Sequence, residues 1–411
     1  MTLRKPASAW TRREFLLGTA GAGFLLTQGL GGEPRGPESS AAPSSSGIDG
    51  LKHAFLNPPH AAKPMTRWWW FGGAVTPEEI TRELTLMRDA GLRGVELQPV
   101  YPLAVDDPKR GIRNVRYFTP EWFDLLRHTL RETKRLGLQF DFTLGSGWPF
   151  GGPFIPGKLA AHEIRVLTRE AGGPGEFSWD LNPYLTDSVR TFAVVAAPVE
   201  STGNVDISRS IVISGVISGV ISGKMSSNGK LKWEVPEGRW KIMVFTDSLT
   251  GQQVKRPTIG MEGYVIDHFS REALDLFLQA VGARTVKELQ SVADPPFSSV
   301  FCDSLEVFGA DWTPHFMQEF QKRRGYDLTP YLPALWENAG ADTPHVRYDY
   351  HQALSDLMMD NFFRPMGEWS RSRKMTARVQ AHGAMGDVMR GYGLSDIPEG
   401  EEGTDADQYS V

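Results

Sequence analysis

Apolar runs alternate with amphipathic stretches along the chain from about residue 67. Thr76 followed by Pro77 is typical of an N-cap and the first turn of a helix, and Gly91 is placed to end that helix. Thr119 and Pro120 repeat the N-terminal signal, and the short apolar runs around both helices have the length of buried strands. The pattern predicts strand, helix, strand, helix, strand at residues 68–71, 76–91, 94–97, 119–137 and 138–143.

The same alternation returns in the C-terminal third of the chain. It predicts helices at 270–290, 312–324 and 348–373, and strands at 298–303 and 377–382. Strands that alternate with helices are typical of a parallel sheet with right-handed crossovers. About five strand–helix units are therefore expected, and the fold class is α/β.

Residues 163–265 interrupt this rhythm with β-rich runs and no helical pattern. Strands are predicted at 191–195, 231–235 and 240–245, with a turn at 235–238 between the last two. The region is predicted to be an antiparallel β-domain inserted into the α/β unit.

The insert repeats the tetrapeptide VISG three times between residues 212 and 223. Three tetrapeptides cannot form the core of a β-solenoid, because each repeat depends on its stacked neighbours. We interpret the repeat as an expansion within a surface loop rather than as a short solenoid.

The N-terminus has the features of a targeting signal. Arg12 and Arg13 directly precede an apolar run at 15–30, which is shorter than the roughly 20 residues that a membrane-spanning helix needs. A segment rich in Pro, Ser and Gly follows. This resembles a twin-arginine (Tat) export signal with a flexible linker at 1–46, so we expect a periplasmic or extracellular protein without a stable membrane anchor once the signal is removed.

Composition excludes several classes of function. The net charge is −5 and Lys and Arg form no cluster, so a nucleic-acid surface is not expected. Cys302 is the only cysteine, which excludes an intrachain disulfide and a cysteine-based zinc site. The chain also has 12 Trp residues, and Trp rings both fill cores and stack on sugars.

Polar residues directly after predicted strands are the candidates for chemistry, because functional groups of α/β folds gather at the carboxyl ends of strands. Carboxylates, one His and several aromatic residues meet this condition, which suits a site that hydrolyses sugars. Candidate contacts to substrate are Trp70, Glu96, Trp148 in a Gly-rich loop, and His382.

Each candidate also has a structural interpretation. Glu306 can be an acid that leads a helix, and residues 68–70 can be core packing. His382 can be a structural histidine, and the acids between 396 and 402 can form a solvated turn.

Six strings in order resemble glycoside hydrolase family 106, whose members are α-L-rhamnosidases. The resemblance extends from about residue 55 to about 402. The strings are RWWWFG at 67–72, GSGWP with GGP at 145–153, FCDSLE at 301–306, RRGYDL with YLP at 323–333, QAHG at 380–383, and DIPEGE at 396–401.

The resemblance implies a (β/α)8-type catalytic barrel, an inverting mechanism, a calcium ion at the sugar, and a rhamnose-containing oligo- or polysaccharide as substrate. Glu306 matches the general acid, which is expected to have a raised pKa. Asp303 and Glu399 match candidate calcium ligands. The general base is expected beyond the C-terminus, with Glu401 as a weak candidate within the chain.

Five strands cannot close an eight-stranded barrel, and residues 403–411 no longer resemble the family. We therefore expect a truncated copy with little or no activity, organised as residues 1–46, 47–162, 163–265, 266–402 and a divergent tail at 403–411. Two alternatives remain open: a non-catalytic or vestigial carbohydrate-binding protein, and a barrel glycosidase for another sugar.

Overall fold

The computed structural model describes residues 47–217, 220–223, 229–383 and 385–400. The predicted export signal, the divergent tail and Glu401 lie outside these residues. The chain forms two compact units, Met1–Pro58 and Pro59–Val411. In the first, α2 (Ile48–Leu56) exposes the apolar side chains of Ile48, Leu51 and Phe55. No helix among the described residues is long and apolar enough to cross a membrane.

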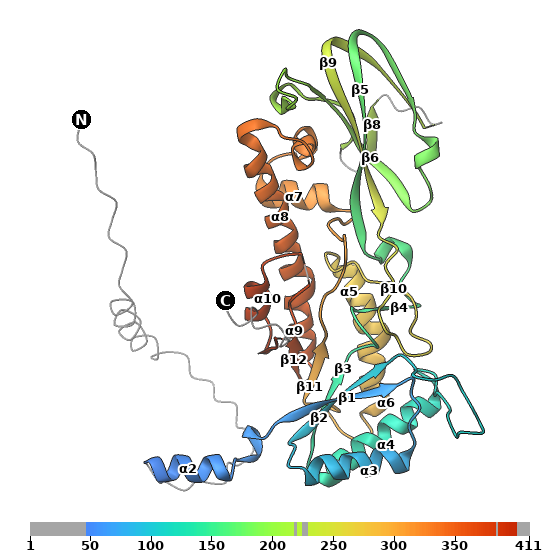
Figure 1. The fold of residues 1–411 in the computed structure, drawn as a ribbon, viewed down its shortest axis with the longest axis vertical. Helices are drawn as coiled ribbons and strands as arrows, with labels where there is room; N and C mark the ends of the chain where they lie inside the picture. The colour runs from blue at the N-terminus through green and yellow to red at the C-terminus, as the bar shows by residue number, and fades with distance from the viewer. Residues whose placement is uncertain (1–46, 218–219, 224–228, 384, 401–411) are drawn as a thin grey trace. The chain divides into compact units, whose positions relative to one another are not determined.

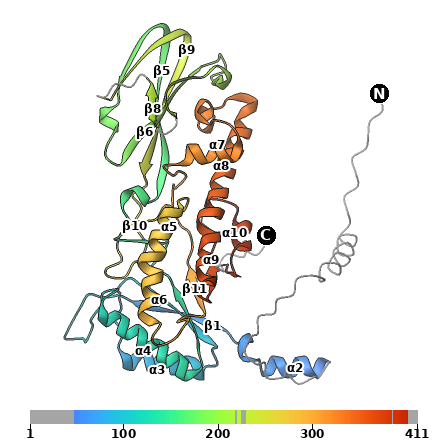
Figure 2. The same cartoon turned by 180° about the vertical axis from the view of Figure 1, so that it is seen from behind.

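The second unit is built on a six-stranded sheet in which every pair of neighbours is parallel (Figures 1 and 2). This confirms the predicted parallel sheet, while its closure into a barrel stays a prediction. The order across the sheet is β1 (Met65–Phe71), β2 (Gly94–Val100), β3 (Gln139–Thr143), β11 (Ser299–Cys302), β12 (Thr376–Val379) and β13 (Ile397–Pro398).

Two helices, α3 (Pro77–Asp89) and α4 (Pro120–Leu136), cover one face of β1 and β2, as Figure 1 shows at its lower end. Their predicted caps are confirmed. The side chains of Thr76 and Thr119 each accept a hydrogen bond from the backbone N–H three residues on, at 3.3 Å. Gly137 ends α4 with a φ of 70°, a conformation that is cheap only for glycine.

The later helices predicted from the sequence are present, although two of them begin at other residues than predicted. The helix predicted from residue 312 begins at Phe316, because Trp312 instead forms a bridge to His162. The helix predicted from 348 begins at Thr343, with a proline in its first turn. Two of the helices continue through wider π-helical turns, at Leu278–Ala283 and Met359–Phe363. The helices are α5 (Arg271–Phe277), α6 (Arg284–Leu289), α7 (Phe316–Arg324), α8 (Thr343–Met358), α9 (Arg364–Arg371) and α10 (Val388–Gly393).

The inserted region forms a five-stranded antiparallel sheet, seen at the upper end of Figure 1, which confirms the predicted β-rich insert. Its order is β5 (His162–Asp180), β9 (Lys230–Leu249), β6 (Val189–Pro198), β7 (Ile211–Ile217) and β8 (Val220–Gly223). The short strand β4 (Gly151–Gly152) precedes the insert in the chain, and β10 (Tyr264–Val265) follows the inserted sheet. These two strands pair with each other in an antiparallel arrangement.

The turn predicted at 235–238 is wrong. β9 continues through these residues and pairs with β5 along its whole length, with one irregularity opposite residues 173–175. A prolyl residue lacks the N–H of a regular ladder, and this bulge accommodates Pro236 inside the strand. At the bulge the backbones approach so closely that a Cβ on Gly173 would lie 2.0 Å from the carbonyl oxygen of Pro236.

The surface loop predicted for the VISG repeat is also wrong. The repeat forms β7 and β8, which pair as an antiparallel hairpin at the edge of the inserted sheet. The repeated Val–Ile pairs are β-branched and favour an extended backbone, and an edge position needs a partner on one side only.

Candidate active site

Adjacent residues of β1 point to opposite sides of the parallel sheet. Trp68 faces the helices, where its indole N–H donates to Glu83 of α3 at 2.8 Å. Trp70 lies on the same face and is completely buried, so it is not placed to stack on a sugar, contrary to the sequence-based prediction. Trp69 is 39% exposed and donates to the side-chain oxygen of Gln98 at 2.9 Å. Of these neighbouring tryptophans, Trp69 is therefore the one available for ligand contact.

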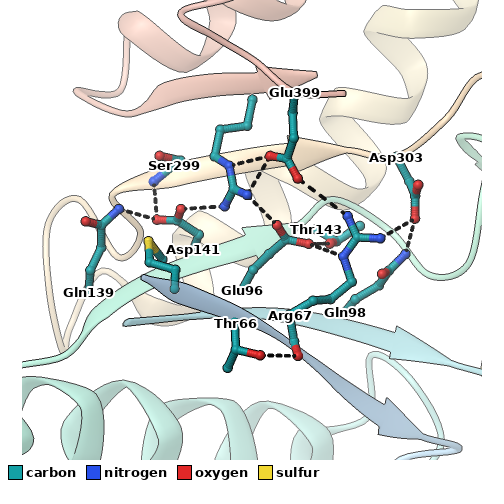
Figure 3. Close-up of polar contacts among 12 residues, drawn as sticks. Thr66, Arg67, Glu96, Gln98, Gln139, Asp141, Thr143, Ser299, Asp303 and Glu399 are labelled. Carbon is teal, nitrogen blue, oxygen red and sulfur yellow. Dashed lines mark hydrogen bonds and ion pairs between the residues drawn. The ribbon is translucent and has the colours of Figure 1, made fainter. Parts of the chain in front are cut away.

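The face opposite α3 carries a network of two arginines and four carboxylates, which we call the arginine–carboxylate network (Figure 3). Arg67 of β1 lies 3.2 Å from Glu96, 3.5 Å from Asp303 and 3.8 Å from Glu399. Arg378 of β12 joins the other side of the network: it lies 2.9 Å from Glu96, 2.8 Å from Asp141 and 2.6 Å from Glu399.

Glu96 lies at the centre of this network and is only 2% exposed. Burial raises its pKa to about 7, although Arg67 and Arg378 pull the pKa down. Thr143 adds a hydrogen bond at 3.2 Å. The predicted contact of Glu96 with substrate does not fit this position, because its carboxylate is enclosed by partners from neighbouring strands.

The structure brings the two predicted calcium ligands to one guanidinium. Asp303 and Glu399 both lie within 4 Å of Arg67, and Asp303 also accepts from the side-chain amide of Gln98 at 2.7 Å. Arginine supplies the positive charge at the place where a cation would stand, so this arrangement does not fit a calcium ion held by these two residues. No group of three or more His, Cys, Asp or Glu within the described residues is placed to hold a metal. A role for calcium stays a prediction.

Glu306 follows β11 and has a side chain that is 34% exposed. Its Oε2 accepts a hydrogen bond from the ammonium of Lys255, and its Oε1 accepts from the hydroxyl of Ser304 at 3.3 Å. The side-chain amide of Gln252 donates to its main-chain carbonyl at 2.7 Å. Lys255 and Gln252 come from the segment after the inserted sheet, which sequence analysis did not single out because no parallel strand precedes it.

Lys255 controls the charge of Glu306. Burial raises the pKa of Glu306, but the hydrogen bond and the positive charge of Lys255, together with hydrogen bonds from Trp148 and Ser304, outweigh burial and hold the pKa below its ordinary value. The expectation of a raised pKa is therefore wrong for the molecule without a ligand.

The Gly-rich loop at 145–149 holds the Lys255 segment in place. The backbones of Trp148 and Lys255 exchange two hydrogen bonds, at 3.0 and 2.7 Å. Gly147 has a φ of 62°, and a Cβ there would lie 2.0 Å from the carbonyl oxygen of Lys255. The hydroxyl of Ser146 also links this loop to the Lys255 segment, because it accepts a hydrogen bond from Thr258 N–H at 2.8 Å. The half-buried Trp148 therefore belongs to the same site as Glu306 and Lys255.

The predicted candidate His382 also comes close to the Glu306 loop. Its main-chain carbonyl accepts a hydrogen bond from Leu305 N–H at 3.0 Å, and its side chain is half-buried. A Cβ on Gly383 would lie 3.0 Å from the backbone of Leu305. The loops after β11 and β12 thus contact each other, as expected for carboxyl ends of adjacent parallel strands.

Comparison with known proteins agrees with this arrangement. The family model of glycoside hydrolase family 106, described as α-L-rhamnosidase, matches residues 56–183 and 188–409. The chain belongs to glycoside hydrolase family 106. This confirms the resemblance drawn from the six strings.

The chain is similar to parts of two longer proteins. A curated protein of Formosa agariphila, which carries a provisional β-glucuronidase name, is 25% identical over 403 residues, covering 85% of this chain and 33% of the relative. The solved rhamnosidase of Novosphingobium sp. PP1Y superposes with a TM-score of 0.65 and 18% identity, covering 84% of this chain and 49% of that protein. The chain thus spans about a third of the first and about half of the second, and the second shows a shared fold.

Proposed function

We propose that this chain carries the general acid of an exported, inverting α-L-rhamnosidase that removes rhamnose from oligo- or polysaccharides. The observation that carries the proposal is the position of Glu306. It lies after the fourth strand of the parallel sheet in a family 106 chain, with a partly exposed carboxylate beside Trp148. Export rests on the twin-arginine pattern at residues 12–13.

In this proposal Glu306 donates a proton to the glycosidic oxygen as the bond to the sugar breaks. The ion pair with Lys255 keeps Glu306 ionised before substrate binds. A sugar that displaces the ammonium of Lys255 raises the pKa of Glu306 and allows the carboxyl group to take up the proton it must donate. Binding is thereby coupled to protonation of the acid.

An inverting glycosidase needs a second carboxylate roughly 6.5–9.5 Å away to activate water. The acids of the arginine–carboxylate network are already engaged in ion pairs with Arg67 and Arg378, so their oxygens are not free to position an attacking water. We propose that the base lies outside the described residues, where Glu401 is only a weak candidate.

The test compares the purified chain with its Glu306→Gln variant on a rhamnose disaccharide and on nitrophenyl α-L-rhamnoside. Because this chain is expected to have little activity, the same substitution is also made at the matching position of a full-length family 106 rhamnosidase. There we expect the variant to lose about 100-fold or more on the disaccharide and less on the nitrophenyl substrate, whose leaving group needs little protonation. Glu234→Gln, on the exposed surface of β9, is the matched control. NMR of the first product anomer tests inversion, and chelation followed by calcium addition tests the metal.

The same experiment separates the alternatives. Binding of rhamnosides without turnover favours a non-catalytic carbohydrate-binding protein. Equal activity of wild type and Glu306→Gln on the disaccharide contradicts the proposed acid.

A second candidate is a glycosidase that acts on glycans containing uronic acids. The ammonium of Lys255 lies beside Glu306, and the next residue, Arg256, is exposed with its guanidinium 4.9 Å from the ring centre of Tyr101. These cations could bind a sugar carboxylate next to the bond that is cleaved. Arg256 also has a φ of 55°, a strained backbone of the kind found at functional sites. Cleavage of glucuronides in preference to rhamnosides, lost in Arg256→Met, would favour this function.

A further inference from the structure

A cavity lined by both polar and apolar residues lies between the inserted sheet and the α/β part of the chain. Its volume is about 250 Å³, and its lining does not include Gln252, Lys255 or Ser304, which bond Glu306. The inserted sheet contributes His162, Asp247 and Leu249, while the α/β part contributes Asp267 and Thr313. Neither the family match nor the proposed chemistry assigns this cavity a role.

His162 is the first sign that the cavity is a binding site. The residue is only 7% exposed, and its Nδ1 lies 2.5 Å from Asp247 Oδ1. Its other ring nitrogen, Nε2, is buried and has no partner at hydrogen-bond geometry among the described residues, although the backbone of Gly157 comes close enough to the ring to raise its pKa. Buried polar atoms are normally paired, because an unpaired one loses its bonds to water without replacement. A ligand with a hydroxyl group would supply the missing partner.

Asp267, on the other side of the cavity, is the second sign. It is 1% exposed, and its carboxyl group accepts from the Thr313 hydroxyl at 2.6 Å and from Phe269 N–H at 2.9 Å. Burial raises its pKa to about 7, so near neutral pH the group exists both as an acceptor and as a donor. Such a group can bind a hydroxyl in either direction.

The charges around the cavity nearly balance. Lys158 pairs with Glu272 at 3.3 Å, as His162 pairs with Asp247. Arg190 and Asp187 add one charge of each sign, and Asp267 adds a partial negative charge near neutral pH. A site with little net charge and no excess of positive charge favours a neutral ligand rich in hydroxyl groups over an anionic one.

The size of the cavity and its apolar wall further limit the kind of ligand that would fit. Leu159, Leu249 and Pro314 form an apolar surface, which suits the C–H face of a sugar. Pockets for drug-sized ligands have volumes of about 300–1,000 Å³, so this smaller cavity suits a single ring. We propose that the cavity between the inserted sheet and the α/β part binds one neutral monosaccharide unit through His162, Asp267 and Thr313, separately from Glu306.

The test is titration calorimetry of the full chain with L-rhamnose, D-glucose, D-galactose and, as the charged probe, D-glucuronate. We expect at least one neutral sugar to bind, and its affinity to fall about tenfold or more in His162→Phe and in Thr313→Val. Thr313→Val keeps the shape of the side chain and remains informative if His162→Phe does not fold. Trp148→Ala, in the Glu306 site, is the matched control that should leave this binding unchanged.

Three results would overturn the proposal. One is that none of the neutral sugars binds at concentrations up to tens of millimolar. Another is that binding survives in a folded Thr313→Val variant but is lost in Trp148→Ala, which would place the sugar at the Glu306 site. The third is stronger binding of glucuronate than of every neutral sugar, which would contradict the charge balance. Failure here leaves the rhamnosidase proposal intact, because that proposal depends on Glu306 alone.

Discussion

The ammonium of Lys255 donates a hydrogen bond to the carboxylate of Glu306, and the two residues are 51 positions apart in the chain. This contact sets the protonation state of the proposed general acid before any sugar is present. The ion pair lies between the segment after the inserted sheet and the loop after β11. The segment that follows the inserted sheet thus contacts the loop that carries the proposed acid.

Replacing Lys255 by Met should raise the pKa of Glu306. The ammonium stabilises the ionised carboxylate, so its removal leaves burial as the main influence on the pKa. In an active protein the alkaline limb of the pH–rate profile should move to higher pH, and carboxyl NMR should report the same direction. Lys232→Met, which removes a more exposed ion pair with Glu176 at 3.6 Å, is the control. An unchanged Glu306 titration would contradict the role of Lys255.

Replacing Arg378 by Met should destabilise the protein by about 3–5 kcal/mol, the usual cost of removing one partner of a buried ion pair. The side chain of Arg378 is 13% exposed, and its removal leaves Glu96 and Asp141 buried with fewer partners. The free energy of unfolding, measured by urea denaturation, checks this. Arg239→Met breaks an exposed pair with Glu170 and should cost less than about 1 kcal/mol. Equal losses in the two variants would mean that the network is not buried as described.

Asp267 should make stability depend on pH. Its pKa is about 7 in the folded state and about 3.9 when unfolded, so the unfolded chain releases this proton first as the pH rises. The free energy of unfolding should fall by up to about 1.4 kcal/mol per pH unit between these values and level off above them. His162 acts in the same direction, because its pKa is also raised: burial lowers the pKa, but Asp247, with smaller contributions from Asp267 and the backbone of Gly157, outweighs burial.

The Asp267→Asn variant removes the titration of Asp267. Denaturation at pH 5, 6, 7 and 8 should give a flatter profile for this variant than for the wild type. Glu234→Gln, an exposed site on β9, should keep the wild-type slope. A wild type whose stability rises between pH 5 and 7 would contradict the raised pKa of Asp267.

Replacing Gly147 by Ala should displace the Lys255 segment. The added Cβ would lie 2.0 Å from a backbone oxygen, and the φ of 62° is itself costly for alanine, so we expect a loss of about 2 kcal/mol or more. Thermal unfolding measures the loss, and Trp148 fluorescence should report the altered loop. Gly172→Ala, where a Cβ meets nothing within 4 Å, is the matched control. A Gly147→Ala protein as stable as this control would contradict the close approach.

The sequence by itself determined the local elements and their order. The caps at Thr76 and Thr119 and the left-handed Gly137 depend on neighbours within one helical turn, so they can be predicted from a short window. The parallel sheet followed from the alternation of these elements. The general position of Glu306 followed as well, because strand ends gather at one edge.

Only the tertiary structure decided which groups meet. Trp70 and Trp69 are neighbours in sequence, yet one is fully buried against the helices and the other is 39% exposed, since strand residues alternate between faces. Charged residues within the strands, Arg67 and Arg378, were the available signal for the network, but their partners lie up to about 330 residues away. The continuation of β9 through residues 235–238 also depends on partners distant in the chain, in this case on β5. The Lys255–Glu306 ion pair depends on distant partners in the same way. Pairing across sheets and loops depends on contacts distant in the chain, which no local pattern encodes.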